Sequence, residues 1–543
     1  MTDGSDPMAP SGAVNPIDTD YKVGQDNIVL NVGPFGLDIH NRVFAVSGLL
    51  VVAFVVLTLA FQNQVEPMFS AMRNWLTSNL DWFFIAAGNI FVVVMLAVAV
   101  SPLGKVRLGG TEATPDYTYL GWFSMLFAAG MGIGLMFFGV SEPLSHFGSA
   151  FGGTTVEGGV RTDWAPLGAA AGDAEAATRL GMAATIYHWA LHPWAIYATI
   201  ALGLALFSFN KGLPLTIRSV FYPLLGERIW GWPGHIIDIL AVLATLFGLA
   251  TSLGYGASQA SSGLNFLFDV PLGNTTQIVL VIGITAIALA SVVAGLDAGV
   301  KRLSEINMAL ALLLMVFVIA VGPTLDILSG FFANLGAYVQ YLPALSNPVG
   351  REDINYSQGW TAFYWAWWIS WSPFVGMFIA RVSRGRSVRE FILAVLIVPS
   401  LACVLWMTVF GETAILQVVR DGYEAAKTAE LPLQLFTMLD ALPLASITSF
   451  IAIILVVVFF VTSSDSGSLV IDVIAAGGKV DAPLPQRVFW CTFEGLVAIA
   501  LILGGGLVAL QAMAVSTGLP FIIVLLMSAV AVVKGLASEP RPR

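Results

Sequence analysis

Charged residues are scarce in this sequence of 543 residues. Asp, Glu, Lys and Arg together make up only 11% of it, whereas a soluble domain carries about 25%. Hydrophobic residues make up 57%, so the chain is not an ordinary soluble protein, and its composition predicts many membrane spans rather than one anchor. The formal net charge of −10 also excludes a polycationic surface for nucleic acid.

Cysteine and recognisable catalytic motifs are scarce as well. Cys403 and Cys491 both lie in apolar runs, which predicts inert core thiols and no disulfide. We find no HExxH motif and no nucleophile–base pair, so we expect that the protein is not an enzyme. We also find no repeated rings of polar residues of the kind that line a channel. No basic start followed by a short apolar run is present, so we expect no cleavable signal peptide.

Twelve apolar runs are long enough to cross a bilayer, which needs about 20 residues. The runs are 43–62, 81–101, 117–140, 183–207, 235–265, 276–296, 306–328, 359–380, 388–411, 447–475, 487–508 and 511–533. The predicted fold is therefore an all-α integral membrane protein. Residues 1–42 are polar and rich in aspartate, so we expect a disordered tail before the first span.

The distribution of basic residues predicts the orientation in the membrane. Most of the 24 lysine and arginine residues lie in the termini and in the even-numbered connections between the predicted spans. Because basic residues stay on the cytoplasmic side, both termini are expected to be cytoplasmic, in a bacterial inner membrane.

Two of the predicted spans carry helix-breaking residues at their centres. The third has three glycines at alternate positions from Gly130 to Gly134, and the eighth has Ser372, Pro373 and Gly376. Unwound backbone at membrane depth is tolerated only beside a cavity. Breaks five spans apart favour a secondary transporter built from two five-span repeats, with its site at the midplane. A channel or a membrane enzyme with kinked helices remains an alternative.

Aromatic rings cluster inside two spans rather than at their ends. The segment "YHWALHPWAIY" contains Trp189, Trp194 and Tyr197, and the eighth span contains four tryptophans between Trp365 and Trp371. Interfacial belt residues lie at span ends instead. Several ring faces around one point would attract a quaternary ammonium group, at roughly 0.5–2 kcal/mol for each contact. Ordinary aromatic packing between helices is the alternative.

Five segments together resemble the signatures of the betaine/carnitine/choline transporters. They are "AAGMGIGLMFFGVSEP", "YHWALHPWAIY", "TLFGLATSLG", "FYWAWWISWSPFVGMFIARVSRGR" and "FVTSSDSGS", and the resemblance extends over all twelve predicted spans. It implies a leucine-transporter-like 5+5 inverted repeat with two extra N-terminal spans, assembled as a homotrimer among membrane lipids. The implied parts are a tail (1–42), two peripheral spans (43–101), a first repeat (117–330), an amphipathic connection (331–358), a second repeat (359–534) and a short tail (535–543).

The resemblance also implies where a substrate binds. An aromatic box of Trp189, Trp194, Tyr197 and Trp368 would hold a trimethylammonium group. Free amides of the third span would take a carboxylate. The remaining implied substrate-binding residues are Trp367, Trp371, Ala129, Gly130, Met131, Gly134 and Ser252.

Sodium is the coupling ion that the resemblance implies, with no other cofactor. One site would use the hydroxyls of Thr462 and Ser463 with backbone oxygens of Ala128, Met131 and Phe459. Back-bonding of these hydroxyls to their own helix is the alternative. A second site would use Thr245 and Phe374. A further hydroxyl expected four residues after Thr245 is replaced by Leu249, which puts that second site in doubt.

At position 134 this chain has glycine, as the zwitterion-selective, sodium-coupled members of the family do. Choline-selective members have aspartate at this position. The expected function is therefore sodium symport of a betaine-like onium zwitterion, a compatible solute such as glycine betaine or dimethylsulfoniopropionate. The alternatives are a sodium-independent antiporter of the carnitine type and a choline/proton symporter.

Four other polar residues are candidates of lower weight. Asp465 lies deep in the tenth span, where an acid is a functional candidate by default. Glu142 is expected to cap a helix or face water. His188 and His192 are four residues apart, but no acidic residue lies between them and Pro193 follows, so we expect no zinc site there.

Overall fold

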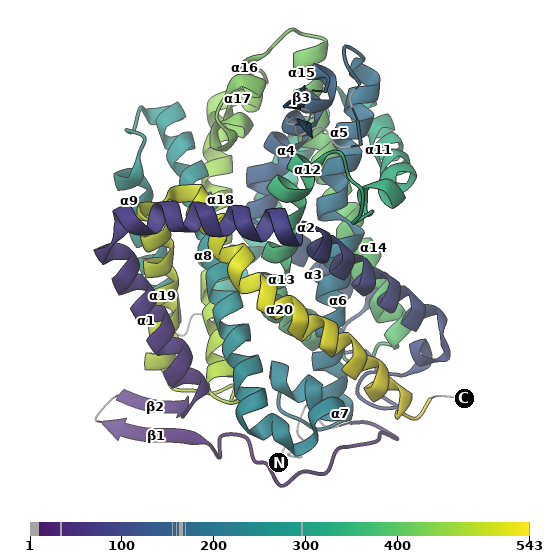
Figure 1. Ribbon diagram of the computed structural model, residues 1–543, viewed down its shortest axis with the longest axis vertical. Coiled ribbons are helices and arrows are strands. Elements are labelled where there is room, and N and C mark those ends of the chain that lie inside the picture. Colours follow the sequence, from purple (N-terminus) through teal and green to yellow (C-terminus); the bar gives the residue numbers. More distant parts are fainter. Residues whose placement is uncertain are drawn as a thin grey trace.

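The computed structural model describes residues 10–32, 35–154, 156–158, 160–161, 167–168, 170–294 and 297–541. Helices form almost all of it, and the described parts of both chain ends lie at the lower end of the bundle in Figure 1, the end that also carries the hairpin of β1 (Asn27–Val32) and β2 (Phe35–His40). A second, two-residue hairpin joins β3 (Val156–Glu157) to β4 (Val160–Arg161).

The α-helices are α1 (Val43–Ala60), α2 (Gln62–Val100), α3 (Tyr119–Gly130), α4 (Ile133–Gly152), α5 (Ala174–Trp189), α6 (Leu191–Ala205), α7 (Tyr222–Leu225), α8 (Trp232–Phe268), α9 (Asn274–Ala294), α10 (Asp297–Val321), α11 (Thr324–Leu345), α12 (Ile354–Tyr356), α13 (Ala362–Val382), α14 (Val388–Met407), α15 (Thr413–Val419), α16 (Ala425–Thr428), α17 (Gln434–Asp440), α18 (Ala445–Ala475), α19 (Leu484–Leu503) and α20 (Gly506–Ala537). Short 3₁₀ turns are η1 (Pro102–Lys105), η3 (Ile217–Phe221), η4 (Gly226–Trp230) and η7 (Leu431–Leu433), and short π-helical turns are η2 (Leu206–Asn210), η5 (Ser357–Thr361) and η6 (Thr408–Glu412).

The all-α membrane class is confirmed. Among the described residues, 10 helices are long and apolar enough to cross a membrane, or up to 11 if the bent pair α3 and α4 is one span. The expected eighth span, α13, is outside that number because its tryptophans, serines and tyrosine lower its mean hydropathy. The count of twelve and the two-repeat organisation therefore stay predictions. The helix α2 begins at Gln62, well before the predicted start of the second span.

Burial separates central helices from peripheral ones. The most apolar 18-residue window is 94% buried in the α5–α6 span and 83% buried in α8, but only 28% buried in α9 and in α10. The helix α13 packs against both α6 and α8 and buries most of its own residues. These central helices carry the predicted aromatic residues, so the rings lie in the protein interior and not at the lipid surface.

The predicted break in the third span is confirmed. The helix α3 ends at Gly130, α4 begins at Ile133, and the two are bent by 62°. Met131 and Gly132 between them have extended backbone, so neither residue continues the helix.

The predicted break in the eighth span is wrong. The helix α13 runs without interruption through Pro373. Proline cannot donate to the carbonyl four residues back, which is that of Ile369, and the Ser372 hydroxyl donates to this carbonyl instead at 2.7 Å. Gly376 serves close packing, because a Cβ at this position would come within 2.5 Å of Ile200 on α6.

A different break occurs in the fourth span, where none was predicted. The helix α5 ends at Trp189, α6 begins at Leu191, and Ala190 between them leaves the helical region with φ −99° and ψ −119°. Pro193 was the available signal, because it leaves the carbonyl of Trp189 without its helical donor.

The described part of the N-terminal tail is packed and not disordered. Asp38 on β2 forms an ion pair with Lys479, and Asn27 on β1 donates to the carbonyl of Ala476 at 2.9 Å. Burial and the nearby charge of Arg218 lower the pKa of His40, at the end of β2, to about 3. The hairpin therefore packs against the C-terminal end of α18 and is held there by these contacts.

Arg218 anchors this end of the bundle. Its Nε lies 3.2 Å from Oδ2 of Asp238 on α8, and both side chains are fully buried. Its other nitrogens reach Nε2 of His40 at 3.3 Å and the hydroxyl of Tyr21 at 3.0 Å. Arg218 therefore joins the N-terminal segment to α8.

Replacing Asp238 with Asn should destabilise the protein by about 3–5 kcal/mol, because it leaves the guanidinium of Arg218 buried without a countercharge. Thermal or chemical unfolding of the purified protein measures this. The matched control is Glu305→Asn, which breaks an exposed pair with Lys301 and should change unfolding little. Equal effects of the two substitutions would contradict the anchoring role of Arg218.

Candidate binding site

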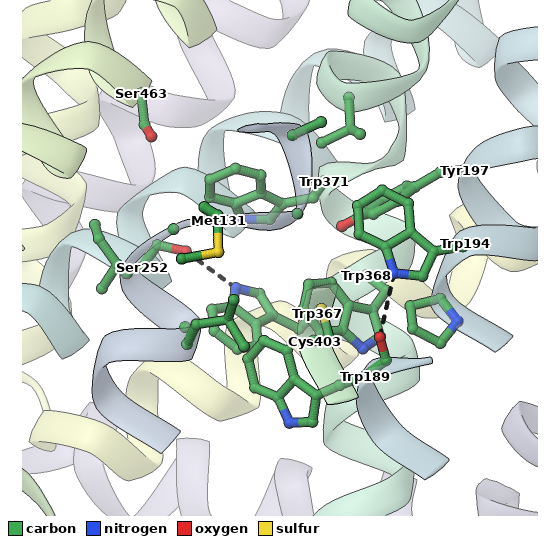
Figure 2. A pocket seen from close by; sticks show the side chains of 18 residues that line it. Met131, Trp189, Trp194, Tyr197, Ser252, Trp367, Trp368, Trp371, Cys403 and Ser463 are labelled. Carbon is green, nitrogen blue, oxygen red and sulfur yellow. Dashed lines mark hydrogen bonds between the residues drawn. The ribbon is translucent and has the colours of Figure 1, made fainter. Parts of the chain in front are cut away.

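One cavity is lined by all the residues that the sequence assigned to substrate. We call it the aromatic cavity. It lies between the α3–α4 break, α6, α8 and α13 (Figure 2), and it contains the predicted set of Trp189, Trp194, Tyr197, Trp367, Trp368, Trp371, Ala129, Gly130, Met131, Gly134 and Ser252. Residues more than 240 positions apart in the chain thus meet at one point.

The four rings predicted to form a box are neighbours. The centroids of Trp189 and Trp368 are 5.0 Å apart with their planes at 80°, and those of Tyr197 and Trp368 are 6.0 Å apart at 86°. Trp194 lies 5.3 Å from Tyr197 at 71°. Each ring is nearly perpendicular to the next one, so the four rings surround a space and do not stack on one another.

The break at Ala190 fixes two of these rings. The carbonyl of Trp189, which Pro193 leaves without a helical donor, accepts from the indole Nε1 of Trp194 at 3.2 Å. The carbonyl of His188 accepts from the indole Nε1 of Trp368 at 2.9 Å. Each bond holds an indole by its polar edge and leaves its face available to the cavity.

Trp367 and Trp371 are fixed in the same way, by acceptors on α8. Trp367 donates to the hydroxyl of Ser252 at 3.2 Å, and Trp371 donates to the carbonyl of Gly248 at 3.0 Å. With these N–H groups engaged, the two indoles offer the cavity ring faces and no free donor. A quaternary ammonium group has no N–H to donate, so it is matched to such walls.

The free amides lie slightly later in the chain than predicted. Ala129 and Gly130 are inside α3, and the amide of Met131 donates to the carbonyl of Ala128 at 3.2 Å. The N-terminal amides of α4, from Gly132 to Leu135, precede its first helical hydrogen bonds, and all four residues line the cavity. A helix N-terminus attracts a carboxylate, and at this cavity that N-terminus belongs to α4.

Gly134 brings the first turn of α4 against two rings. A Cβ at this position would lie 2.7 Å from Cη2 of Trp189 and 3.1 Å from Cη2 of Trp367. A larger side chain therefore cannot enter without moving both rings.

A second cavity adjoins the first and contains the residues of the first predicted sodium site. We call it the hydroxyl cavity. Ala128, Met131, Phe374, Phe459, Thr462 and Ser463 line it. Met131 and Ser463 also line the aromatic cavity, and Figure 2 shows the Ser463 hydroxyl at the edge away from Trp189. The Thr462 hydroxyl donates to the carbonyls of Val458 at 3.0 Å and Phe459 at 3.1 Å, so back-bonding to the helix is also present.

The predicted second sodium site is not brought together in the same way. Phe374 lines the hydroxyl cavity, but Thr245 lines neither cavity and donates to the carbonyl of Ala241 at 2.7 Å. Leu249, where a hydroxyl would be needed, packs against Gly467 of α18. Apolar packing thus occupies the contact between α8 and α18.

A third cavity continues from the hydroxyl cavity toward the chain ends. Both are lined by Ala128 and Phe378, and the third also contains Asp465 and Arg487, whose Oδ1 and Nη2 atoms are 3.1 Å apart. Arg487 follows Gln486, whose side chain bonds to Asp38 of the terminal hairpin. We therefore call this space the terminus-side cavity.

The opposite side is closed by rings. The ring centroid of Phe138 lies 6.2 Å from that of Trp189 and 6.0 Å from that of Trp367. Beyond Phe138 is an outer vestibule that also contains Arg73 and Lys427, on the side of α16 (Figure 1). The connected cavities thus run from the aromatic cavity toward the end of the bundle that holds the chain termini.

One of the polar candidates, Glu142, differs from expectation. Glu142 is fully buried and does not face water. His188 contacts Glu142 at 2.5 Å, while His192 contacts Asn89 at 2.9 Å, so the two histidines do not share a ligand position. The structure adds His146, 3.3 Å from Glu142, which the sequence reading missed although it follows Glu142 by one helical turn.

Comparisons with known proteins identify the family of this chain. The family described as "BCCT, betaine/carnitine/choline family transporter" matches residues 42–541. The chain is 74% identical to a glycine betaine/proline/choline transporter of Vibrio parahaemolyticus, over 98% of this chain and 96% of that one. It is 54% identical to glycine betaine transporter 1 of the same species, over 96% and 97%, and 40% identical to a glycine betaine transporter of Acinetobacter baylyi, over 92% and 74%.

Replacing Gly134 with Ala should weaken binding of tetramethylammonium about tenfold or more, because the new methyl group displaces the rings of Trp189 and Trp367 and overpacking costs about 1–3 kcal/mol. Quenching of tryptophan fluorescence or calorimetry on the purified protein measures the affinity. Gly152→Ala is the matched control, because Gly152 lies on the same helix, a Cβ there meets nothing within 4 Å, and it does not line the aromatic cavity. If both variants bind like the wild type, the rings beside Gly134 do not form the binding surface.

Proposed function

This chain belongs to the betaine/carnitine/choline transporter family, and we propose that it imports a betaine-like onium zwitterion by sodium symport. Membership makes it a multi-pass membrane transporter and not an enzyme. The observation that carries the substrate proposal is the pairing of an aromatic cage with a helix N-terminus in one cavity. The cage suits a trimethylammonium group, and the amides of α4 suit a carboxylate a few ångströms away.

Glycine betaine is the proposed substrate. It combines the two groups that the cavity is matched to, and it appears in the names of the relatives described above. Dimethylsulfoniopropionate, whose sulfonium replaces the ammonium, is a second candidate. Choline and proline also appear in the name of the relative with 74% identity, so both belong in any substrate test, although Gly134 provides no acidic group to balance the lone charge of choline.

Sodium coupling is proposed at the hydroxyl cavity. Sodium prefers oxygen ligands, and Thr462 and Ser463 supply hydroxyls opposite the broken backbone at Ala128 and Met131. Leu249 and the position of Thr245 favour one sodium ion for each substrate. One charge moving through about 100 mV supplies about 2.3 kcal/mol, which supports roughly fiftyfold accumulation of a zwitterion.

The transport cycle is proposed to be alternating access between two five-span repeats, with the chain termini in the cytoplasm. In that orientation the terminus-side cavity leads to the cytoplasm, and the layer around Phe138 closes the periplasmic side. Assembly as a homotrimer in the bacterial inner membrane is part of the same proposal and follows from family resemblance. A sodium-independent antiporter and a choline/proton symporter are the alternatives that the next experiment separates.

Uptake of labelled glycine betaine into proteoliposomes should require an inward sodium gradient and should depend hyperbolically on sodium concentration. Thr462→Ala should raise the sodium concentration for half-maximal uptake about tenfold or more, because it removes one proposed ligand. The matched control is Thr448→Ala. Thr448 lies on the same helix and back-bonds to Leu444 at 3.2 Å and Ala445 at 3.1 Å, but lines none of the three connected cavities.

Each alternative has its own result in this assay. Exchange of betaine without sodium would replace symport by antiport. Choline uptake driven by a proton gradient, without betaine uptake, would establish the choline/proton symporter. Equal effects of Thr462→Ala and Thr448→Ala would show that Thr462 serves its helix only.

A further inference from the structure

A buried carboxylate lies directly behind the aromatic cavity. Glu142 on α4 has no exposed surface, and it does not line the cavity. Four side chains surround it. Its Oε2 accepts from Nε1 of Trp189 at 2.7 Å and from the hydroxyl of Tyr364 at 2.6 Å, and its Oε1 lies 2.5 Å from Nδ1 of His188 and 3.3 Å from Nε2 of His146.

The donors around Glu142 favour an ionised carboxylate. An indole N–H can only donate, and a carboxylate accepts at both oxygens without bringing a donor of its own. Nδ1 of His146 is buried without a hydrogen-bond partner among the described residues, so the proton of that ring is placed on Nε2, where it donates to Glu142. A neutral carboxyl group would add its own O–H proton to the four donor protons that already point at it, so one of these donors would lose its acceptor.

This carboxylate is connected to three of the rings around the site. Trp189 lines the aromatic cavity and is held directly by its N–H. Tyr364 is also held directly, and its ring lies 5.5 Å from that of Trp189 and stacks 6.2 Å from that of Trp368. Trp368 is held through His188, whose backbone carbonyl accepts its indole N–H.

His188 is itself fixed on every side. Its Nε2 lies 2.9 Å from the hydroxyl of Thr361, and its ring stacks on Tyr364 at 4.6 Å with 17° between the planes. Movement of Glu142 would therefore shift the backbone at the α5–α6 break, where two rings of the box are anchored.

Glu142, His146 and His188 together also have the composition of a metal site, but their spacing opposes it. Ligands at 2.0–2.1 Å around a tetrahedral zinc ion are about 3.3 Å apart, whereas Glu142 and His188 are 2.5 Å apart. The second carboxylate oxygen is already occupied by Trp189 and Tyr364. The cluster is a hydrogen-bonded network.

We propose that Glu142 is a positioning and specificity-determining residue: through the N–H of Trp189 it orients the box and makes the ring face more attractive to a positive head group. The inference rests on the proposed function of the aromatic cavity. A negative charge at the indole N–H adds electron density to the ring, and its field acts through an interior of low dielectric constant. Glu142 thus favours a charged head group over a neutral one of equal shape.

The test compares two ligands that differ only in that charge. Glycine betaine and 3,3-dimethylbutanoate share the carboxylate and the three methyl groups, but carbon replaces the quaternary nitrogen in the second. Affinities are measured by calorimetry for wild type, Glu142→Gln and Glu142→Asp. The matched control is Glu412→Gln, which alters a half-buried carboxyl group, bonded to Asn334 at 2.8 Å, outside the aromatic cavity.

Glu142→Gln should weaken glycine betaine binding about tenfold or more and change 3,3-dimethylbutanoate binding less, so that the ratio of the two affinities narrows. Glu142→Asp keeps the charge and should keep most of that ratio, with weaker binding of both ligands. Glu412→Gln should leave both affinities unchanged. If Glu142→Gln does not fold, a ratio of the two affinities that is mostly kept in Glu142→Asp supports the charge effect, and a collapsed ratio overturns it.

An equal loss of both ligands in Glu142→Gln would overturn the charge effect and leave a structural role only, and no loss would overturn the inference entirely. The wild type tests the proposed function separately. If it binds choline but not betaine, the substrate assignment fails and the same comparison is made with choline and 3,3-dimethylbutan-1-ol. If it binds no onium compound, both proposals fail.

Discussion

Backbone groups that leave a helix at membrane depth must find other partners, and the site of this protein depends on how they do so. At the α5–α6 break, the carbonyls of His188 and Trp189 are taken by indole N–H groups of Trp368 and Trp194. The same two hydrogen bonds therefore satisfy the carbonyls at the helix break and fix two rings of the aromatic box. A tryptophan is suited to it because its edge donates while its face remains apolar and electron-rich.

The second break supplies the opposite polarity. At Met131 and Gly132 the chain turns by 62°, so that α4 starts at the cavity with its amides free, and Gly134 allows the rings to approach that start closely. The cavity thus combines ring faces with a helix N-terminus, the two partners that the proposed zwitterion needs. The buried Glu142, further along α4, links the two, because it belongs to the helix that supplies the amides and accepts a hydrogen bond from Trp189, one of the rings.

Composition and hydrophobic run length were enough to predict the all-α membrane class, and the glycine spacing was enough to predict the α3–α4 break. The aromatic set was also predictable, because "YHWALHPWAIY" and the eighth span place their rings away from the interfaces. The break in α13 was predicted wrongly, because whether Pro373 opens a helix depends on the rotamer of Ser372. The role of Pro193 was missed, since its consequence appears only when Trp194 reaches back to Trp189. Glu142 could not be placed from sequence, because its four partners come from three separate segments.

The most direct measurement of the central claim is a crystal structure with the trimethylarsonio analogue of glycine betaine, whose arsenic atom is located by its anomalous scattering. The account predicts one arsenic peak within about 6 Å of the ring centroids of Trp189, Trp194, Tyr197 and Trp368, with the carboxylate toward the N-terminus of α4. A peak elsewhere, for example in the outer vestibule between Arg73 and Lys427, with none among these rings, would contradict it.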